Sequence, residues 1–390
     1  MRIPLPFLLA FLSAIPPLAI DMYLPAMALM AGDLRVDIHQ VELSVSTFLI
    51  GYAIGQLSGG PLSDRFGRRP VIILGLSLFS IASLLLITVE SLQNLLALRV
   101  FQAVGGGIAT VNSAAVVRDR YQGNDIAKTL SMVAMIMMLA PLIAPMLGSL
   151  VVKFGHWREI FTFLSIYAVL VLIILTWQLE ESHPKENRQK ASPWQNYLRV
   201  IRHRRARGFI LSLAFAFATM FVFITASPYL YLEYFNQPPS VFPWLFGSNI
   251  VVMMTMNRLN MVLLNRYSSK QLLTMGIIIQ LLAILSLVML YLVVPPSLWI
   301  TVPLIALAVG SLGLIAANAM SLVLHYFQDI SGSATALIGV TEFCIGALFG
   351  YFWTLLHNAT PLPMMVIMAV SAILALLFAL RASKSAEESC

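Results

Sequence analysis

Two charged residues interrupt long apolar stretches in the first half of the sequence, and both are of types that carry proton chemistry. Asp21 lies within the apolar stretch 5–29, and Arg99 lies within the stretch 93–116. An ionised side chain inside a bilayer costs a few kcal/mol, so such a residue usually has a partner or a function. At about 1.5 Å per residue, both lie roughly 10 Å from the same predicted end of their stretches. We expect either that Asp21 binds and releases a proton while Arg99 adjusts its proton affinity, or that the two form a permanent structural ion pair.

A second acid and a second base are embedded in the other half of the chain. Glu342 lies within the apolar stretch 333–355, and Arg258 lies within the stretch 243–264. These two either form an ion pair or separately line a cavity, which they would then favour for charged or zwitterionic substrates. Glu342 therefore joins Asp21 and Arg99 as a candidate for proton coupling, and Arg258 is a candidate for the cavity.

The composition indicates a membrane protein. Of 390 residues, 59% are hydrophobic and 11% are charged, whereas about a quarter of the residues of a soluble domain are charged. The net charge of +7 does not indicate a nucleic-acid partner, because Lys and Arg are confined to short segments between apolar runs, where they suit phospholipid headgroups. The P-loop pattern G-x-x-x-x-G-K-[ST] is missing from the sequence, which excludes an ATP-driven pump. No cofactor and no metal site are predicted.

The apolar stretches are long enough to be membrane spans, which need about 20 residues each. Twelve spans are predicted, at 5–29, 43–62, 70–89, 93–116, 129–151, 160–178, 208–232, 243–264, 271–292, 298–322, 333–355 and 363–380. The segment between the two sets of six, 180–207, has 11 charged residues out of 28. The predicted organisation is a six-helix bundle at 1–179, a basic cytoplasmic connector at 180–207, a second bundle at 208–382 and a tail at 383–390.

The basic residues predict the orientation of these spans. With the N-terminus inside, cytoplasmic segments hold 19 of the 24 Lys and Arg, and external loops hold only Arg35, Lys153 and Arg158. Both termini are therefore expected in the cytoplasm. The retained first span, with no small-residue cleavage site, favours an anchored N-terminus over a signal peptide.

The loop after the second predicted span carries a dense motif of glycines and charges. It reads Gly60-Pro61-Leu62-Ser63-Asp64-Arg65-Phe66-Gly67-Arg68-Arg69. Glycines permit a tight turn between helices, and the arginines suit anionic headgroups. The corresponding loop of the second half, 263–270, matches it at an offset of 201 residues, with Asn265 in place of Asp64 and Arg266 in place of Arg65. The offset predicts a duplicated six-helix unit whose first loop is the functional gate.

This loop resembles the G-x-L-x-D-R-x-G-R-R/K signature of the major facilitator superfamily. Two further segments are similar to motifs of that family: Arg99-Val100-Phe101-Gln102-Ala103-Val104-Gly105 in the fourth span, and 140–149 in the fifth, where Pro141, Pro145 and Gly148 match the segment typical of antiporters. Together with Asp21-Met22-Tyr23-Leu24-Pro25, they resemble the bicyclomycin/chloramphenicol-resistance (Bcr/CflA) branch of drug:proton antiporters. The resemblance implies an all-α membrane protein with the major facilitator fold, twelve transmembrane helices in two pseudo-symmetric bundles.

The resemblance also implies a function: export of small drug-like molecules in exchange for protons across the bacterial inner membrane by alternating access, with the protein acting as a monomer. Apolar walls with few polar groups suit promiscuous binding. Candidate cavity residues are Tyr23, Tyr52, Phe217, Phe221, Tyr229, Asn249, Arg258 and Asn318. The glycine rows 51/55/59 and 339/346/350 make small helix faces, which either slide between the two halves or pack within one half.

Other functions stay open. A metabolite exporter of nucleosides, amino acids or siderophores would have the same fold but would ignore unrelated drugs. An uptake symporter is less compatible with the antiporter-type segment at 140–149. A membrane receptor or a membrane enzyme would need a soluble effector region or clustered catalytic residues, and the sequence has neither.

Overall fold

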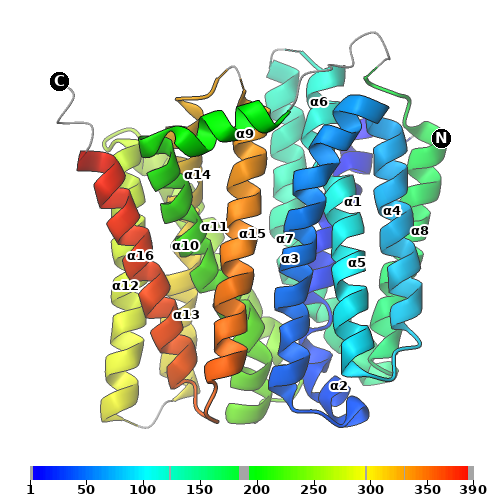
Figure 1. Cartoon of the computed structure of the whole chain (residues 1–390). Helices are drawn as coiled ribbons and strands as arrows, with labels where there is room; N and C mark the ends of the chain where they lie inside the picture. The colour runs from blue at the N-terminus through cyan, green and yellow to red at the C-terminus, as the bar shows by residue number, and fades with distance from the viewer. Residues whose placement is uncertain (1–2, 123, 184–192, 295–296, 329, 385–390) are drawn as a thin grey trace. The chain divides into compact units, whose positions relative to one another are not determined.

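The computed structural model describes residues 3–122, 124–183, 193–294, 297–328 and 330–384. Every secondary-structure element in these ranges is helical. The chain forms two compact units, residues Met1–Ala191 and Ser192–Cys390. Figure 1 shows each unit as a bundle of long helices, and each is described here by itself.

Unit 1 contains six long helical segments, two of which are interrupted. In chain order its elements are α1 (Leu5–Asp21), the short 3-10 helix η1 (Leu24–Ala26), α2 (Met27–Leu34), α3 (Ile38–Phe66), α4 (Arg68–Leu86), α5 (Leu92–Thr110), α6 (Ser113–Arg120), α7 (Asn124–Phe154) and α8 (Arg158–Gln178).

Unit 2 has the same plan after one additional helix at its start. Its elements are α9 (Pro193–Arg202), α10 (Arg204–Pro228), the π-helical turn η3 (Tyr229–Tyr234), α11 (Phe242–Leu263), α12 (Ser269–Val293), α13 (Leu298–Gly310), α14 (Leu312–Leu324), α15 (Ser331–Leu356) and α16 (Leu362–Lys384).

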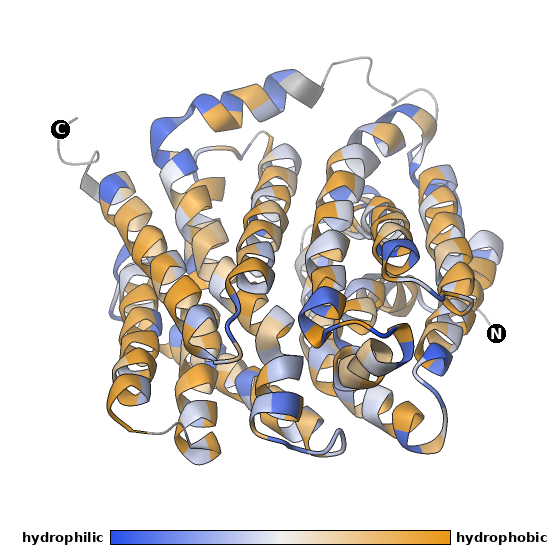
Figure 2. Ribbon diagram, turned by 60° about the horizontal axis from the view of Figure 1, so that its bottom comes forward, coloured by the Kyte–Doolittle hydropathy of each residue, from blue (hydrophilic) through white to orange (hydrophobic). Residues whose placement is uncertain are grey.

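These segments confirm the twelve predicted spans. Within the described residues, ten of them are apolar and long enough to cross a membrane by length and composition alone. The other two are α3 and α11, whose embedded polar residues, such as Glu42 and Arg258, lower their hydropathy. Figure 2 shows hydrophobic residues along most of the long helices. On α4, the side chains of Leu74, Ile81 and Leu85 are exposed, as expected of a surface that faces lipid.

Four spans that were predicted as continuous helices are interrupted, and the interruptions recur in the two units. The fourth span breaks at Val111-Asn112 and the tenth at Ser311, about 200 residues apart, close to the 201-residue offset between the two loops. The first span breaks after Asp21, and the seventh continues from α10 into the π-helical η3. This recurrence agrees with a duplicated six-helix unit.

The predicted connector 180–207 contains ordered structure. Residues 184–192 lie outside the described residues, but α9 occupies 193–202 and α10 begins at Arg204. Tyr197 and Val200 of α9 are buried, because this helix contacts α10 and α15. The sequence reasoning missed this helix because its charged residues outweigh its short apolar side.

The glycines of α3 pack inside unit 1. A Cβ atom on Gly51 would meet the carbonyl of Val100, one on Gly55 would meet the carbonyl of Val104, and one on Gly59 would approach Ile108. All three neighbours belong to α5. The prediction that this face slides between the two halves is therefore wrong, and close packing within one half is correct.

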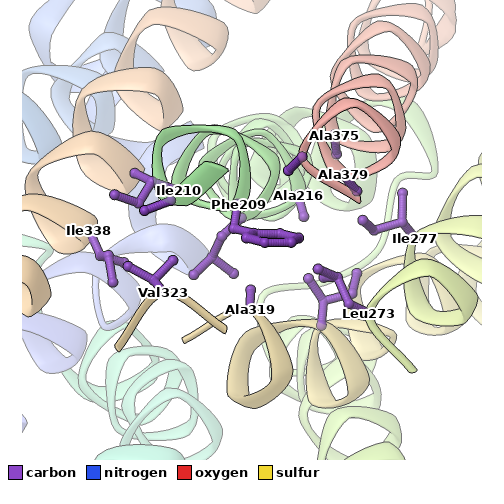
Figure 3. Close-up of a cluster of buried hydrophobic side chains, with 14 of the residues drawn as sticks. Phe209, Ile210, Ala216, Leu273, Ile277, Ala319, Val323, Ile338, Ala375 and Ala379 are labelled. Carbon is purple, nitrogen blue, oxygen red and sulfur yellow. The ribbon is translucent and has the colours of Figure 1, made fainter. Parts of the chain in front are cut away.

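In unit 2, Gly346 of α15 lies against the ring of Phe221 on α10, so it too packs within its own unit. The apolar core of unit 2 lies between α10, α12, α14, α15 and α16. Figure 3 shows its side chains meeting around Phe209, with Leu273 and Ile277 on one side and Ile338 and Val323 on the other.

The α3–α5 contact gives a first testable prediction. Gly55→Ala should lower the stability of the protein by about 1–3 kcal/mol, the usual cost of overpacking, because the added methyl group meets backbone atoms of α5. Gly60→Ala is the matched control, since no atom lies within 4 Å of a Cβ at Gly60. Thermal unfolding of the purified proteins in detergent measures the difference. Equal melting temperatures for the two variants would contradict the packing described here.

Candidate functional site

The break in the first span begins at Asp21 and has a local cause in the sequence. In a continuous helix the carbonyl of Asp21 would accept a hydrogen bond from the residue at position 25, but Pro25 has no N–H group. The helix α1 ends at Asp21, and the Ala26 N–H donates to the carbonyl of Tyr23 (2.9 Å) to form the 3-10 turn η1. Carbonyls of the last turn of α1 are thereby left to find other partners.

Arg99 of α5 is fully buried beside this break. Its Nη2 donates to the carbonyl of Ala19 (3.0 Å), and its Nη1 donates to Oε1 of Gln102 (2.6 Å). The guanidinium lies between the rings of Tyr23 and Phe48, with its Cζ 4.3 Å from each ring centroid. Such cation–π contacts contribute about 2 kcal/mol or more each where the cation is desolvated. The charge of Arg99 is therefore held by a carbonyl, an amide and two aromatic faces.

Polar side chains around Arg99 extend this network. Gln102 donates from Nε2 to Oγ of Ser83 (2.9 Å), which in turn donates to the carbonyl of Phe79 (2.7 Å). On the other side, the hydroxyl of Tyr23 and that of Ser44 are 2.9 Å apart. The cluster therefore joins the break after α1 to α3, α4 and α5.

Asp21 is buried at 3% exposure, and it does not pair with Arg99. Its Oδ1 has no hydrogen-bond partner among the described residues. The prediction of a permanent structural ion pair is therefore wrong for this structure. Within the described part of the chain, Asp21 has no fixed counter-ion, which at membrane depth is a costly arrangement for an ionised carboxylate and one that proton binding can relieve.

The antiporter-type segment 140–149 of α7 contacts the backbone break after Asp21. Helix α7 has Pro141 and Pro145 in its interior. Its Gly148 lies against the carbonyl of Met22, so that a Cβ atom there would overlap this oxygen and would come 3.3 Å from Cγ of Pro25. The absence of a side chain at Gly148 allows α1 and α7 to approach at the residue next to Asp21.

The far end of the broken first span, in α2, is fixed by a charged contact. Asp33 of α2 accepts hydrogen bonds from Nη1 of Arg158 (2.6 Å) and from Nε1 of Trp157 (3.0 Å). Arg158 also donates from Nη2 to the carbonyl of Val89 (2.8 Å). These bonds tie α2 to the start of α8 and to the residues that follow α4, so this end of the broken span is held.

Sequence reasoning missed a second buried acid in unit 1. Glu42 of α3 is fully buried, and its Oε2 lies 3.1 Å from Nδ1 of His39. The predicted span began at residue 43, five positions after the start of the helix, and so left Glu42 outside it. A capping box formed by Asp37 and Gln40 begins the helix at Ile38, and this S/T/D/N-x-x-E/Q signal is readable in the sequence. Phe48, the second ring beside Arg99, was also missed, because nothing in the sequence distinguishes it from a core residue.

The predicted gating loop forms a compact ionic network within unit 1. Arg68 donates from Nη1 to Asp64 (2.5 Å) and from Nε to Asp119 (3.3 Å), and its backbone N–H donates to Glu181 (2.9 Å). Arg69 donates to the carbonyl of Thr176 (2.7 Å). The loop is thus connected to the end of α6 and to the residues after α8.

The remaining residues of this loop differ in how strongly their surroundings constrain them. Gly67 has φ 103° and ψ 155°, a conformation that other residues rarely adopt, so a glycine is required at the turn between α3 and α4. Gly60 has open space around it. Arg65 is exposed, with its Cζ 5.3 Å from the ring centroid of Phe66.

Of the predicted cavity residues in unit 1, Tyr23 belongs to the Arg99 cluster, and Tyr52 stacks on Phe48 with ring centroids 6.3 Å apart. The Tyr52 hydroxyl lies 2.8 Å from Oγ1 of Thr110. Both tyrosines are buried, Tyr23 against Arg99 and Tyr52 against Phe48, so neither contributes to an open surface.

In unit 2 the predicted residues form separate groups. Phe221 lies near the rings of Phe217 (6.3 Å between centroids) and Phe343 (5.4 Å). Tyr229 lies 5.8 Å from the ring of Trp353.

The predicted polar cavity residues of unit 2 are amides. Asn318 donates from Nδ2 to Oδ1 of Asn260 (2.6 Å), and Asn249 donates to the carbonyl of Phe246 (2.8 Å). Oδ1 of Asn249 has no hydrogen-bond partner among the described residues.

Glu342 and Arg258 form no ion pair with each other. Arg258 is exposed and Glu342 is half-buried. The alternative in which they pair is therefore wrong, and separate roles stay a prediction.

Comparison with known proteins identifies the family of this chain. The sequence profile described as Major Facilitator Superfamily matches residues 9–351 of the chain. The chain belongs to the major facilitator superfamily. It is therefore a membrane transporter of small molecules by family, and the predicted fold class is confirmed.

Relatives within this superfamily agree with the predicted branch. A bicyclomycin resistance protein homolog from Haemophilus influenzae is 32% identical over 372 residues, which cover 95% of this chain and 93% of that protein. A chloramphenicol resistance protein from Pseudomonas aeruginosa is 30% identical over 266 residues, or 66% of this chain and 62% of that protein. Among solved structures, a D-xylose-proton symporter matches with a TM-score of 0.76 at 16% identity over 96% of this chain and 95% of that one, which shows the fold alone.

The contact between α1 and α7 gives a second prediction. Gly148→Ala should lower the transport rate at least about tenfold while the protein still reaches the membrane, because the new methyl group must displace the Met22 carbonyl next to Asp21. Displacements of about 1 Å at a functional group cost up to about 100-fold in rate. Gly32→Ala on α2 is the control, since nothing lies within 4 Å of its Cβ position. Whole-cell efflux, normalised to protein in the membrane fraction, checks this; equal efflux by both variants would contradict the proposed role of the contact.

Proposed function

We propose that this chain exports small drug-like molecules of the bicyclomycin and chloramphenicol type from the bacterial cytoplasm in exchange for protons. The observation that carries the proposal is the buried Asp21 at the break of the first span, whose Oδ1 has no partner within the described residues. Nearby, Arg99 is held by other groups. The names of the two relatives support the class of substrate.

The proton-coupling step follows from the placement of these residues. Asp21 exchanges a proton, and its charge changes at the point where α1 is broken and in contact with α7. Arg99 is a positioning residue for this site. It holds the end of α1 in place through its bond to the Ala19 carbonyl, while Gln102 and two aromatic rings fix the guanidinium itself. An antiporter requires that substrate binding and proton binding favour different states. Drug binding should accordingly release the Asp21 proton.

The proposal extends to the location of the transporter and to its oligomeric state. The excess of Lys and Arg in the predicted internal segments supports a location in the bacterial inner membrane with both termini in the cytoplasm. The duplicated six-helix plan supports transport by a single chain acting as a monomer. Narrow export of one metabolite is the rival function. Competition between structurally unrelated drugs distinguishes it from multidrug export.

The decisive experiment measures proton release from the detergent-solubilised protein as drugs are added. For the wild type, several structurally unrelated compounds should each trigger release and compete with one another. Asp21→Asn should abolish the release, because the neutral amide has no proton to exchange. Glu342→Gln is the matched comparison, since it removes the embedded acid of unit 2. Undiminished release from Asp21→Asn, together with loss in Glu342→Gln, would transfer the coupling role to Glu342. Release triggered by one compound class only would favour the metabolite exporter.

A further prediction concerns the gating loop. Asp64→Asn should slow transport severalfold with little change in melting temperature, because the Asp64 side chain is 47% exposed and the less exposed Arg68 keeps other hydrogen bonds. The variant would lose the charge that pairs with Nη1 of Arg68, while the Arg68 side chain would keep its bonds to Asp119 and Ser63. Asp125→Asn is a suitable control: it removes a comparably exposed carboxylate, which lies 3.1 Å from Lys128. The idea fails if both variants transport at the wild-type rate in reconstituted vesicles.

A further inference from the structure

A row of buried aromatic rings in unit 1 connects the far end of the first span with the surroundings of Arg99. The ring of Tyr23, which packs against the Arg99 guanidinium, lies 6.1 Å from the ring of Phe161 on α8, measured between centroids. The ring of Phe161 in turn meets that of Trp157 edge-on, with 6.0 Å between centroids. All three side chains are at most 1% exposed. We refer to Tyr23, Phe161 and Trp157 together as the ring row.

Charged groups hold the Trp157 end of the ring row. The indole Nε1 of Trp157 donates to Asp33 of α2 (3.0 Å), and the Cζ of Arg158 lies 4.3 Å from a ring centroid of Trp157. Asp33 and Arg158 also form an ion pair (2.6 Å), and both side chains are partly exposed. The ring row therefore extends from a partly exposed charged contact to the fully buried guanidinium of Arg99.

The other end of the ring row lies at the backbone break. Tyr23 follows α1 and precedes η1, so a continuous helix does not set its position. Its side chain is held instead by Arg99, by Phe161 and by Ser44, whose hydroxyl is 2.9 Å from its own. Asp21 and Arg99 both lie close enough to the Tyr23 hydroxyl to interact with it electrostatically. Because a close-packed interior transmits strain, a shift of Tyr23 should displace the rest of the ring row.

We propose that Phe161 and Trp157 are positioning residues for proton exchange at Asp21. They hold the Tyr23 ring against Arg99, and they transmit a change of charge at Asp21 to the charged contact at the far end of the first span. That end is predicted to face the outside, from where a proton-driven exporter takes up its protons. The inference rests on the proton role proposed above for Asp21, and it adds the residues of α8 through which that role reaches the surface.

Ordinary core packing would also bring rings together here, so the proposal needs measured coupling and not proximity alone. The test follows the fluorescence of Trp157 in the purified full-length protein without any drug, as the pH is lowered. The emission of Trp157 is the difference between each protein and its Trp157→Phe counterpart. All proteins carry His156→Gln, because the His156 ring lies 5.6 Å from that of Trp157 and histidine itself titrates near neutral pH. Titration of Asp33 or Glu159 would also alter the emission, but it would persist when Asp21 is replaced.

The protein with Asp21 intact should show a change of Trp157 emission with pH. Asp21→Asn should abolish this change, because the amide has no charge to gain or lose. Phe161→Leu should abolish it too, since the ring row is then interrupted, whereas Phe161→Tyr keeps a ring and should retain it. Phe163→Leu is the matched control on α8: it removes a ring that stacks on that of Tyr167, 6.5 Å away between centroids, and should leave the change intact.

Three outcomes would overturn the positioning role. These are a Trp157 emission that does not change with pH, a change that persists in Asp21→Asn, and an equal response in Phe161→Leu and Phe163→Leu. Drug-triggered proton release, measured on the same preparations, separates this inference from the proposed function. If drugs release no proton while the Trp157 emission still depends on Asp21 and Phe161, drug export fails and the positioning role stands.

Discussion

The arrangement of unit 1 depends on how a fully buried guanidinium is satisfied where no water is available. Polar groups in hydrocarbon must find partners within the protein, and Arg99 finds one in the carbonyl of Ala19. This oxygen is available because α1 stops at Asp21, and α1 stops there because Pro25 cannot donate to the next turn. The backbone break at Asp21 and the partner that holds Arg99 therefore have the same origin, a proline four residues after the acid.

The two units share a plan but differ in what they bury. Their interruptions recur about 200 residues apart, as at Val111-Asn112 and Ser311. In unit 1, however, the interior holds Asp21, Glu42 and Arg99, whereas in the described part of unit 2 the buried polar contacts are made by amides and hydroxyls, such as Gln280 with two backbone carbonyls, Asn318 with Asn260 and Ser212 with the carbonyl of Ala375. Amides do not exchange charge at ordinary pH. This difference favours unit 1 as the place of proton chemistry, and Glu342 of unit 2 stays a prediction.

The sequence predicted what hydropathy and turn chemistry determine, namely the twelve spans, the requirement for glycine at Gly67 and the embedded Asp21 and Arg99. It failed where the outcome depends on which neighbour a side chain meets. Arg99 matched Asp21 in depth, yet its charge is held by Tyr23, Phe48 and backbone, because aromatic faces and a free carbonyl satisfy a guanidinium as a carboxylate does. The glycine rows had the right spacing for close packing, but spacing alone does not distinguish α5 from another helix as the partner.

Conformational change around Asp21 is easier in some helices than in others. Helices α3 and α5 are locked by backbone contacts at Gly51, Gly55 and Gly59, and close-packed contacts of this kind resist small displacements. In α1 and α7, prolines remove internal hydrogen bonds: α1 has Pro16 and Pro17, and α7 has Pro141 and Pro145. Helix α1 bears Asp21, and helix α7 contacts the backbone break that follows it. The change of charge proposed for Asp21 would therefore act on the two helices of unit 1 that each have two interior prolines, while Arg99 and Phe48 lie on the close-packed pair α5 and α3 and Tyr23 lies at the break itself.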